Sequence, residues 1–420
     1  MNWNPLRCRA QTGAAEAVME TPSAKAYVPA TPGRSGRRSL PRPFVFTVMV
    51  ILAMLHAYIG WRLLPDLPLD GAGIAAGIGF LALSCLLIPA GLLARAIRRQ
   101  PLSDRLALAG LLATGLFSSL FVLTLLRDIM LLTADLLFSG AFHAELSRGS
   151  ALAVPITAAL MSLVGYINAR RRARIVEVDI PITGLPDALQ EFTIAQISDV
   201  HVGPTIKRRH IEDIVTRVNA LGADLIAITG DLVDGSVADL AGHTAPLAGL
   251  DAPHGAYFVT GNHEYYSGAA AWVRELRRLG LRVLINEHVV LRHRGAQLLV
   301  AGVTDYSAHR FDPLQRSDPH AAIAGAPGDI GIHILLAHQP RSAHAAEAAG
   351  FDLQLSGHTH GGQFLPWNFF VRLQQPFTAG LRRLGNLWVY TSRGTGYWGP
   401  PKRLGAPSEI TYIRLLKAGA

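Results

Sequence analysis

The pattern of hydrophobic and polar positions divides the chain into three parts. Residues 44–169 are apolar almost throughout, whereas residues 170–420 contain the short apolar runs and polar breaks of a soluble protein. Residues 1–42 have no steady hydrophobic period and are rich in Ala, Pro, Ser, Gly and Arg, which is typical of disordered tails. We therefore expect a disordered N-terminal tail over residues 1–42, a membrane region over residues 43–169 and a folded domain over residues 170–420.

The apolar part contains four stretches that are each long enough to cross a bilayer as a helix, which takes about 20 apolar residues. They cover residues 44–64, 72–94, 106–126 and 151–169. Residues 129–138 either extend the third helix or lie in the membrane interface. The first stretch is longer than the core of a signal peptide, which is about 7–15 residues. The pattern therefore predicts a four-helix transmembrane region.

Charged residues between these stretches predict an orientation. The connection at residues 65–71 has no Lys or Arg, whereas residues 95–105 and 170–174 are rich in arginine. Because positively charged connections stay on the cytoplasmic side, we expect both termini and the C-terminal domain in the cytoplasm, at a bacterial inner membrane. The formal net charge of +9 is concentrated beside the apolar stretches. We interpret it as contacts with membrane lipids and expect no nucleic-acid partner.

Charged residues near the middle of a span would indicate a transport pathway. We interpret Arg127 and Asp128 as a pair at the end of the third stretch that reaches toward the interface. The four helices are then an anchor. The alternative at this point is a membrane transporter or sensor whose soluble domain binds a ligand without catalysis.

Residues 170–420 alternate between short apolar runs and amphipathic segments. Strands are expected at residues 174–180, 192–197, 224–229, 256–260, 282–285, 288–293, 297–302, 331–337, 352–356, 387–391 and 410–415. Helices are expected at residues 207–221, 237–250, 269–279 and 341–349. Such alternation with several hairpins predicts an α/β domain whose mixed sheets are covered by helices.

Five of the expected strands end in Asp, His or Asn side chains. The five exits are Asp199-Val200-His201, Gly230-Asp231-Leu232-Val233-Asp234, Gly261-Asn262-His263-Glu264, His338 and Gly357-His358-Thr359-His360. If these strands are parallel neighbours, all these side chains project into one crevice beyond the sheet. In the last exit, an extended chain would place both imidazoles on the same side.

The residue types at these exits suit metal binding without sulfur. The chain has two cysteines, Cys8 and Cys85, and neither has a plausible disulfide partner or zinc-type spacing. Imidazole and carboxylate without thiolate suit Mn, Fe or Zn. Asp199 and Asp231 supply too little negative charge to neutralise two divalent ions, so the surplus positive charge would attract a phosphate group.

In order and spacing, the five motifs resemble the complete motif set of the calcineurin-like metallophosphoesterases over roughly residues 190–363. The run Gly361-Gly362-Gln363 is similar to membrane-attached bacterial members of that family. The resemblance implies a four-layer α-β-β-α sandwich with two divalent metal ions between the sheet ends.

The resemblance also implies a role for each motif residue. It implies seven metal ligands: Asp199, His201, Asp231, Asn262, His338, His358 and His360. Asp231 bridges both ions. Asp199, His201 and His360 complete the shell of one ion, and Asn262, His338 and His358 that of the other. His263, oriented by Asp234, stands near the leaving group, and a bridging hydroxide is the nucleophile.

We therefore expect a membrane-anchored metal-dependent phosphoesterase that hydrolyses a phosphodiester or pyrophosphate bond. Because the domain is held at the membrane, we expect a lipid-linked phosphate ester, and the resemblance to membrane-attached bacterial members favours a sugar-nucleotide lipid precursor. Tyr265 and Tyr266 either line the entrance or pack. Residues 364–370 either join the core or dip into the bilayer interface. Residues 393–398 include Arg393 and Trp398 as further candidates for substrate contact.

Overall fold

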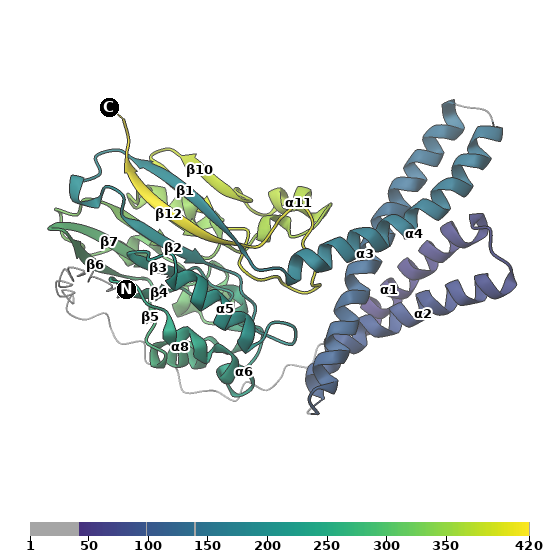
Figure 1. Cartoon of the computed structure of the whole chain (residues 1–420), viewed down its shortest axis with the longest axis horizontal. Helices are drawn as coiled ribbons and strands as arrows, with labels where there is room; N and C mark the ends of the chain where they lie inside the picture. The colour runs from purple at the N-terminus through teal and green to yellow at the C-terminus, as the bar shows by residue number, and fades with distance from the viewer. Residues whose placement is uncertain (1–41, 98, 138–139, 420) are drawn as a thin grey trace, which may run out of the picture.

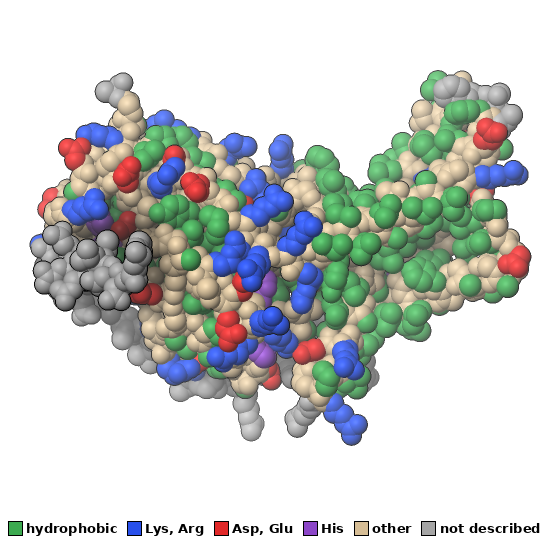
Figure 2. Space-filling view, in the orientation of Figure 1, with side chains coloured by type: hydrophobic (Ala, Val, Ile, Leu, Met, Phe, Trp, Pro, Cys, Tyr) green, Lys and Arg blue, Asp and Glu red, His purple; other side chains and the backbone are tan. Residues whose placement is uncertain are grey.

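The computed structural model describes residues 42–97, 99–137 and 140–419, so all but the last residue of the tail predicted over residues 1–42 lies outside the described residues. Four long helices come first (Figure 1): α1 Arg42–Leu63, α2 Gly71–Leu93, α3 Leu102–Leu137 and α4 Gly140–Arg170. Each is long and apolar enough to cross a membrane. Figure 2 shows them as a largely hydrophobic surface, with Lys and Arg gathered on the remaining domain and along its border with the helices.

The first two predicted spans agree closely with α1 and α2, whereas α3 and α4 are longer than the spans predicted over residues 106–126 and 151–169. α3 continues to Leu137 and α4 begins at Gly140, so residues 129–137 extend the third helix. Two polar residues of this extension have partners: Thr133 Oγ1 donates to the backbone oxygen of Ile129 at 2.8 Å, and Asp135 lies 3.4 Å from His143 of α4.

The interpretation of Arg127 and Asp128 as a pair is correct in part, since Arg127 Nη1 lies 3.9 Å from Asp128 Oδ1, but the arginine does not reach outward. Only 1% of the Arg127 side chain is exposed, and its guanidinium pairs with the Asp66 carboxylate. It also donates to Ser147 Oγ at 3.0 Å and to the backbone oxygen of Arg62 at 2.8 Å. Asp128 in turn accepts from Arg62 Nε at 2.9 Å. Arg127 thus belongs to a buried ion-pair network that ties α1, α3 and α4 together.

The C-terminal domain contains two six-stranded sheets (Figure 1). In spatial order, the first sheet consists of β1 Arg174–Ile182, β12 Glu409–Lys417, β2 Thr193–Ile197, β3 Leu225–Ile228, β4 Ala256–Phe258 and β5 Arg282–Val283. The second consists of β10 Gly380–Leu384, β11 Leu387–Thr391, β9 Leu353–Ser356, β8 His333–Leu336, β7 Ala296–Gly302 and β6 Glu287–His293. All predicted strands are present. The additional strand β10 was not predicted because it carries two arginines and no apolar run.

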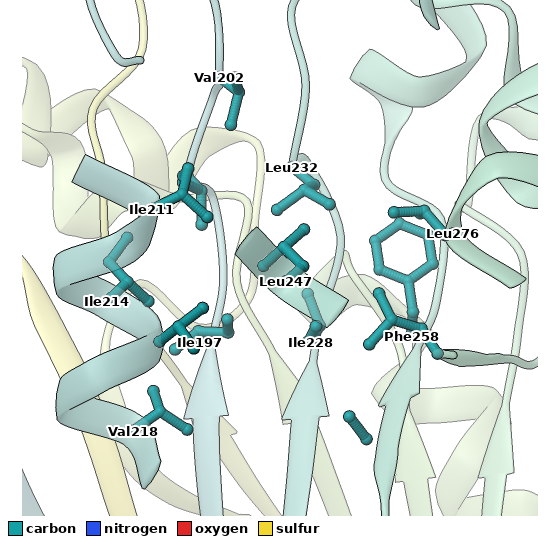
Figure 3. Packing of buried hydrophobic residues seen from close by; sticks show 14 of the residues in the cluster. Ile197, Val202, Ile211, Ile214, Val218, Ile228, Leu232, Leu247, Phe258 and Leu276 are labelled. Carbon is teal, nitrogen blue, oxygen red and sulfur yellow. The ribbon is translucent and has the colours of Figure 1, made fainter. Parts of the chain in front are cut away.

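The central strands are buried on both faces, which explains their continuous apolar sequences. Ile194 and Leu225 pack between the two sheets against residues such as Val300 of the second sheet. The opposite face of the first sheet carries Ile197 and Ile228, which pack against the helices outside it (Figure 3).

Helices cover the outer face of each sheet. α5 Arg208–Asn219, α6 Val237–Thr244 and α8 Ala269–Arg278 pack on the first sheet, and α9 Pro319–Ile323 and α10 Ala343–Ala348 pack on the second. The layers are therefore helix, sheet, sheet and helix, and the predicted four-layer α-β-β-α sandwich is confirmed. Two further short helices, α7 Asn262–Ser267 and α11 Trp367–Phe370, lie outside these layers.

The sandwich rests directly on the membrane helices through a buried lysine. Lys402 Nζ donates to the backbone oxygen of Gly115 at 3.0 Å and to Ser119 Oγ at 2.5 Å, both on α3. It also reaches Ser162 Oγ on α4 at 3.1 Å. Burial lowers the pKa of Lys402 to about 8. Hydrogen bonds to a charged group are worth about 1.5–3 kcal/mol each, so this contact holds the domain firmly against both helices.

Candidate metal centre

The five predicted exits come from both sheets and meet between their ends. β2, β3 and β4 are parallel neighbours in the first sheet, and β8 and β9 are parallel neighbours in the second. The expectation of parallel neighbours is therefore correct within each sheet. It is wrong in placing all five strands in a single sheet, because they belong to two. The site lies where two facing sheets end, because the sandwich places their carboxyl ends side by side.

One group of side chains consists of Asp199, His201 and His360, whose ligand atoms all lie within 4.8 Å of one another. The Nε2 atoms of His201 and His360 are 3.1 Å apart. His360 Nε2 is 3.4 Å from Asp199 Oδ1. Three buried donors directed at one point are the arrangement that a divalent ion needs.

A second group consists of Asp231, His338 and His358, again within 4.8 Å. His338 Nε2 is 3.1 Å from Asp231 Oδ2 and 3.2 Å from His358 Nδ1. Asn262 Oδ1 is buried with no hydrogen-bond partner, which is costly unless a cation or water satisfies it. The residues of this group therefore fit a bound metal ion.

Asp231 lies between the two groups. Its Oδ2 atom is 3.1 Å from His338 Nε2 in the second group and 3.9 Å from His201 Nε2 in the first. The side chain is only 3% exposed. One carboxylate can thus face both positions.

Asp234 orients two imidazoles at once. Its Oδ1 atom is 3.0 Å from His201 Nδ1 and 2.6 Å from His263 Nδ1. His338 is held in the same manner, with Nδ1 2.7 Å from the backbone oxygen of Thr229. When Nδ1 carries the proton for such a bond, Nε2 keeps its lone pair for a metal or a substrate.

The pKa values reflect a cluster that attracts positive charge. Burial disfavours imidazolium, but the carboxylates of Asp234, Asp231 and Asp199 outweigh it and raise the pKa of His201 to about 9. Burial and the neighbouring His338 lower the pKa of His358 to about 3. His358 is therefore neutral near pH 7 and can offer a lone pair.

The backbone at this site is held in a rare conformation. Asp199, His201, Asp231, His358 and His360 all have positive φ, between 51° and 71°. For residues other than glycine, this left-handed region costs about 1–2 kcal/mol per residue. Such strain persists only where the surrounding fold enforces it, and it collects at functional sites.

The left-handed conformation corrects one sequence expectation. The chain through His358 and His360 is not extended, because both residues have positive φ and a short turn of 3-10 helix, His360–Gly362, follows. The two imidazoles still reach one site, but they point to different groups within it.

Two motif glycines are required by close packing on these ligands. A Cβ atom on Gly357 would lie 2.0 Å from Ser198 Oγ and 2.2 Å from Asp199 Oδ2. A Cβ atom on Gly261 would lie 2.2 Å from Asp231 Oδ1. Any side chain at either position would displace a proposed ligand.

Buried hydrophobic residues fix the loops that carry the ligands. Val202 directly follows the first motif and Leu232 lies within the second; both are fully buried and belong to the cluster that includes Ile211 of α5 (Figure 3). Val202 also pairs with Val233 across the two loops. The loops are therefore part of the core and hold a precise shape.

Glu264 has a structural role that the sequence interpretation did not assign. Its buried carboxylate accepts the backbone N–H groups of Gly261 at 2.7 Å, Asp231 at 3.0 Å and Leu232 at 2.8 Å. It thereby joins the exits of β3 and β4. The spacing Gly261-x-x-Glu264 at the start of α7 is a capping-box pattern, which could have revealed this role.

Arg403 braces the first group from outside the motifs. Its fully buried guanidinium contacts His360 Nδ1 at 3.1 Å and donates to the backbone oxygens of His360 at 3.0 Å and Arg393 at 2.7 Å. Burial and this guanidinium hold the pKa of His360 well below its usual value. Arg403 directly follows Lys402, so two consecutive residues connect the first ligand group to the membrane helices.

The residues proposed near the entrance take different positions. Tyr266 and Trp398 flank His263, with ring centroids 5.1 and 5.6 Å from its ring, and line the cavity beside it. Tyr265 contacts Gln315, and Arg393 pairs with Glu409 at 2.9 Å, so these two serve packing.

The apolar segment over residues 364–370 is not core beyond its first residue. Phe364 is 8% exposed, whereas Phe369 is 66% exposed and Phe370 is 54% exposed. Trp367 Nε1 donates to Ser118 Oγ of α3 at 2.9 Å, so the segment lies against the membrane helices.

Comparison with known proteins agrees with these observations. Residues 192–362 match the calcineurin-like phosphoesterase family. A transmembrane protein with metallophosphoesterase domain from Danio rerio is 38% identical over 288 residues, which cover 67% of this chain and 64% of the relative. The Bos taurus protein of the same description is 39% identical over 285 residues, which cover 65% and 64%. A metallophosphoesterase from Aquifex aeolicus is 33% identical over 231 residues, which cover 54% of this chain and 87% of the relative. The chain thus spans less than two thirds of the length of both animal relatives.

Proposed function

The chain belongs to the calcineurin-like metallophosphoesterase family, and from this premise we propose that it is a membrane-anchored, metal-dependent hydrolase of phosphodiester or pyrophosphate bonds. The observation that carries the proposal is the pair of buried ligand groups that meet at Asp231. A non-catalytic sensor or transporter would not need a complete set of oriented donors.

We assign two divalent ions to this site, with Mn, Fe or Zn as the metals that suit its donors. Asp199, His201 and His360 would hold one, Asn262, His338 and His358 would hold the other, and Asp231 would contact both. When bound, such ions would neutralise charge on the phosphoryl oxygens and activate water for in-line attack. The unpartnered Asn262 Oδ1 supports this assignment.

His263 is proposed to protonate the leaving oxygen. Its Nδ1 atom is 2.6 Å from Asp234 Oδ1, which leaves Nε2 free to face the cavity. With 14% of its side chain exposed, the ring is accessible to a substrate but still held in one orientation. When both ring nitrogens carry a proton, Nδ1–H stays bonded to Asp234 and Nε2 can give its proton to a departing alkoxide, which leaves the ring neutral.

The substrate class we propose is a lipid-linked phosphodiester or pyrophosphate, with a sugar-nucleotide headgroup as the first to screen. Support comes from the position of the site, since the cavity beside His263 is lined partly by residues of α1 and α3. A site that opens toward membrane helices suits a substrate that is itself held in the bilayer.

We propose that the sandwich faces the cytoplasm. Exposed arginines at residues 99, 105 and 170–172 all lie at the helix ends nearest the sandwich, whereas residues 64–70 at the opposite end carry no Lys or Arg. Positively charged flanks remain in the cytoplasm. A protease added to inside-out membrane vesicles is expected to remove the sandwich, and the same protease added outside intact cells is expected to leave it whole. The reverse pattern would refute this orientation.

Metal removal tests the proposed activity. The full chain, purified in detergent, is expected to contain two divalent ions per molecule by mass spectrometry and to hydrolyse bis(p-nitrophenyl) phosphate. Chelation is expected to abolish this hydrolysis, because the phosphoryl charge is no longer neutralised, and Mn, Fe or Zn is expected to restore it. Undiminished hydrolysis by metal-free protein would contradict the proposal.

A further inference from the structure

We propose that α1 and α3 form the apolar half of the substrate pocket and hold the hydrocarbon chain of an amphiphilic phosphoester during hydrolysis. This inference rests on the proposed function of the metal centre. It adds that the membrane helices bind substrate as well as anchoring the sandwich.

A single cavity joins the metal centre to the helices. Its volume is about 690 Å³, within the range of roughly 300–1,000 Å³ that is usual for ligand pockets. One end is lined by His201, Asp231, Asn262, His263, His358 and His360. The other end is lined by Leu55 of α1 and by Thr114, Phe117, Ser118 and Phe121 of α3. A molecule can therefore occupy both ends at once.

The helix end of this cavity is largely apolar, because the hydroxyls of Thr114 and Ser118 are already bonded to Gly110 and Trp367. Leu55, Phe117 and Phe121 offer no charge and no hydrogen-bonding side chain to a polar headgroup. Phe117 is stacked on the His56 ring at 4.3 Å, and its centroid is 6.1 Å from that of Phe121. A wall of this kind favours hydrocarbon over a water-soluble phosphate.

One wall of the cavity adjoins surface that lipid would cover. Trp367 lines the cavity and is bound to Ser118 of α3. The residues that follow it present exposed apolar side chains, with Phe369 at 66%, Phe370 at 54% and Leu373 at 84% exposure. Exposed aromatic and aliphatic side chains next to membrane helices suit the boundary between headgroups and acyl chains. A chain held in the bilayer can thus enter without crossing water.

Amide side chains line the same cavity as the metal ligands and the aromatic rings. They belong to Gln363 and Gln374. Gln363 is already held in place, since its Nε2 atom donates to the backbone oxygen of Trp398 at 2.9 Å. The cavity therefore offers metal ligands, amides and aromatic rings to one ligand, which suits a phosphoester that carries a single apolar tail.

Two substrates with one leaving group test the inference: p-nitrophenyl methyl phosphate and p-nitrophenyl octyl phosphate, assayed with the full metal-loaded chain in nanodiscs. Each methylene that leaves water favours binding about three- to fourfold. Burial of only two of the seven extra methylenes would therefore raise kcat/KM about tenfold, so we expect kcat/KM to be at least about tenfold higher for the octyl ester. Thr114→Trp fills the helix end of the cavity. It is expected to lower kcat/KM for the octyl ester about tenfold and to leave the methyl ester within about twofold.

Leu125→Trp is the matched control, because Leu125 is on the same helix, is 40% exposed and does not line this cavity. This substitution is expected to leave kcat/KM unchanged for both esters. The inference would be overturned if the ratio of kcat/KM for the octyl ester to kcat/KM for the methyl ester were the same in the wild type and in Thr114→Trp. If metal-loaded wild type hydrolyses neither ester, the proposed function fails instead. In that case this inference is decided separately, by comparing how much octyl phosphate and methyl phosphate each raise the melting temperature of the wild-type chain. Octyl phosphate is expected to raise it more. Equal stabilisation by both phosphates would refute it.

Discussion

Asp231→Asn is expected to reduce hydrolysis of bis(p-nitrophenyl) phosphate on the order of 10³-fold and to lower the metal content of the purified chain. Asp231 faces both ligand groups, at 3.1 Å from His338 Nε2 and 3.9 Å from His201 Nε2. Asparagine keeps the shape of the side chain but removes its charge. Two cations held close together then lose the anion between them.

Asp179→Asn is the matched control for this charge removal. Asp179 is 45% exposed on β1 and pairs with Arg414, far from the ligand groups, so the same change there is expected to leave activity unaltered. The measurements are kcat/KM and the number of ions per chain by mass spectrometry. Asp231→Asn protein with near-normal turnover and two bound ions would show that the assignment of Asp231 is wrong.

His263→Asn is expected to lower kcat by about 10²- to 10⁴-fold for a phosphodiester with an alkyl leaving group, while the metal content stays normal. The imidazole is held by Asp234 and faces the cavity, so it can protonate the departing oxygen. A p-nitrophenolate leaving group needs little help from an acid. The loss is therefore expected to be clearly smaller for p-nitrophenyl esters.

The comparison between leaving groups separates proton donation from a merely structural role. Equal losses on alkyl and aryl esters would mean that His263 shapes the site and does not act as an acid. His309→Asn is the control, because His309 is exposed and lies outside this cavity. It is expected to leave both rates unchanged.

The elements of the sandwich were largely predictable because its strands are short and continuously apolar. β2 and β3 are buried along their whole length, so the apolar run and the strand have nearly the same bounds. β10 escaped prediction because Arg382 and Arg383 interrupt any apolar pattern on this exposed edge strand. The local hydrophobic pattern reflects which residues are buried, and few residues of an exposed edge strand are buried.

The membrane region was predictable in number but not in length. α1 and α2 end where their apolar runs end, whereas α3 and α4 continue through polar residues. Arg127 is accommodated in α3 because Asp66 of the preceding connection and Ser147 of α4 complete its hydrogen bonds. Those partners are distant in sequence, so a window of neighbouring residues could not reveal them.

The sequence by itself determined the donor set and its order: carboxylate, imidazole and amide side chains placed directly after apolar strands. It also determined that four apolar helices precede the sandwich, because residue chemistry and hydrophobic period are local properties of a chain. Only the tertiary structure decided that the five exits converge from two sheets, that five proposed ligands adopt left-handed backbone, and that Phe117 and Phe121 of α3 share a cavity with His263. These relations arise from packing between segments that are far apart in sequence. They exist only in the folded protein, because the segments contact one another only when the core is packed.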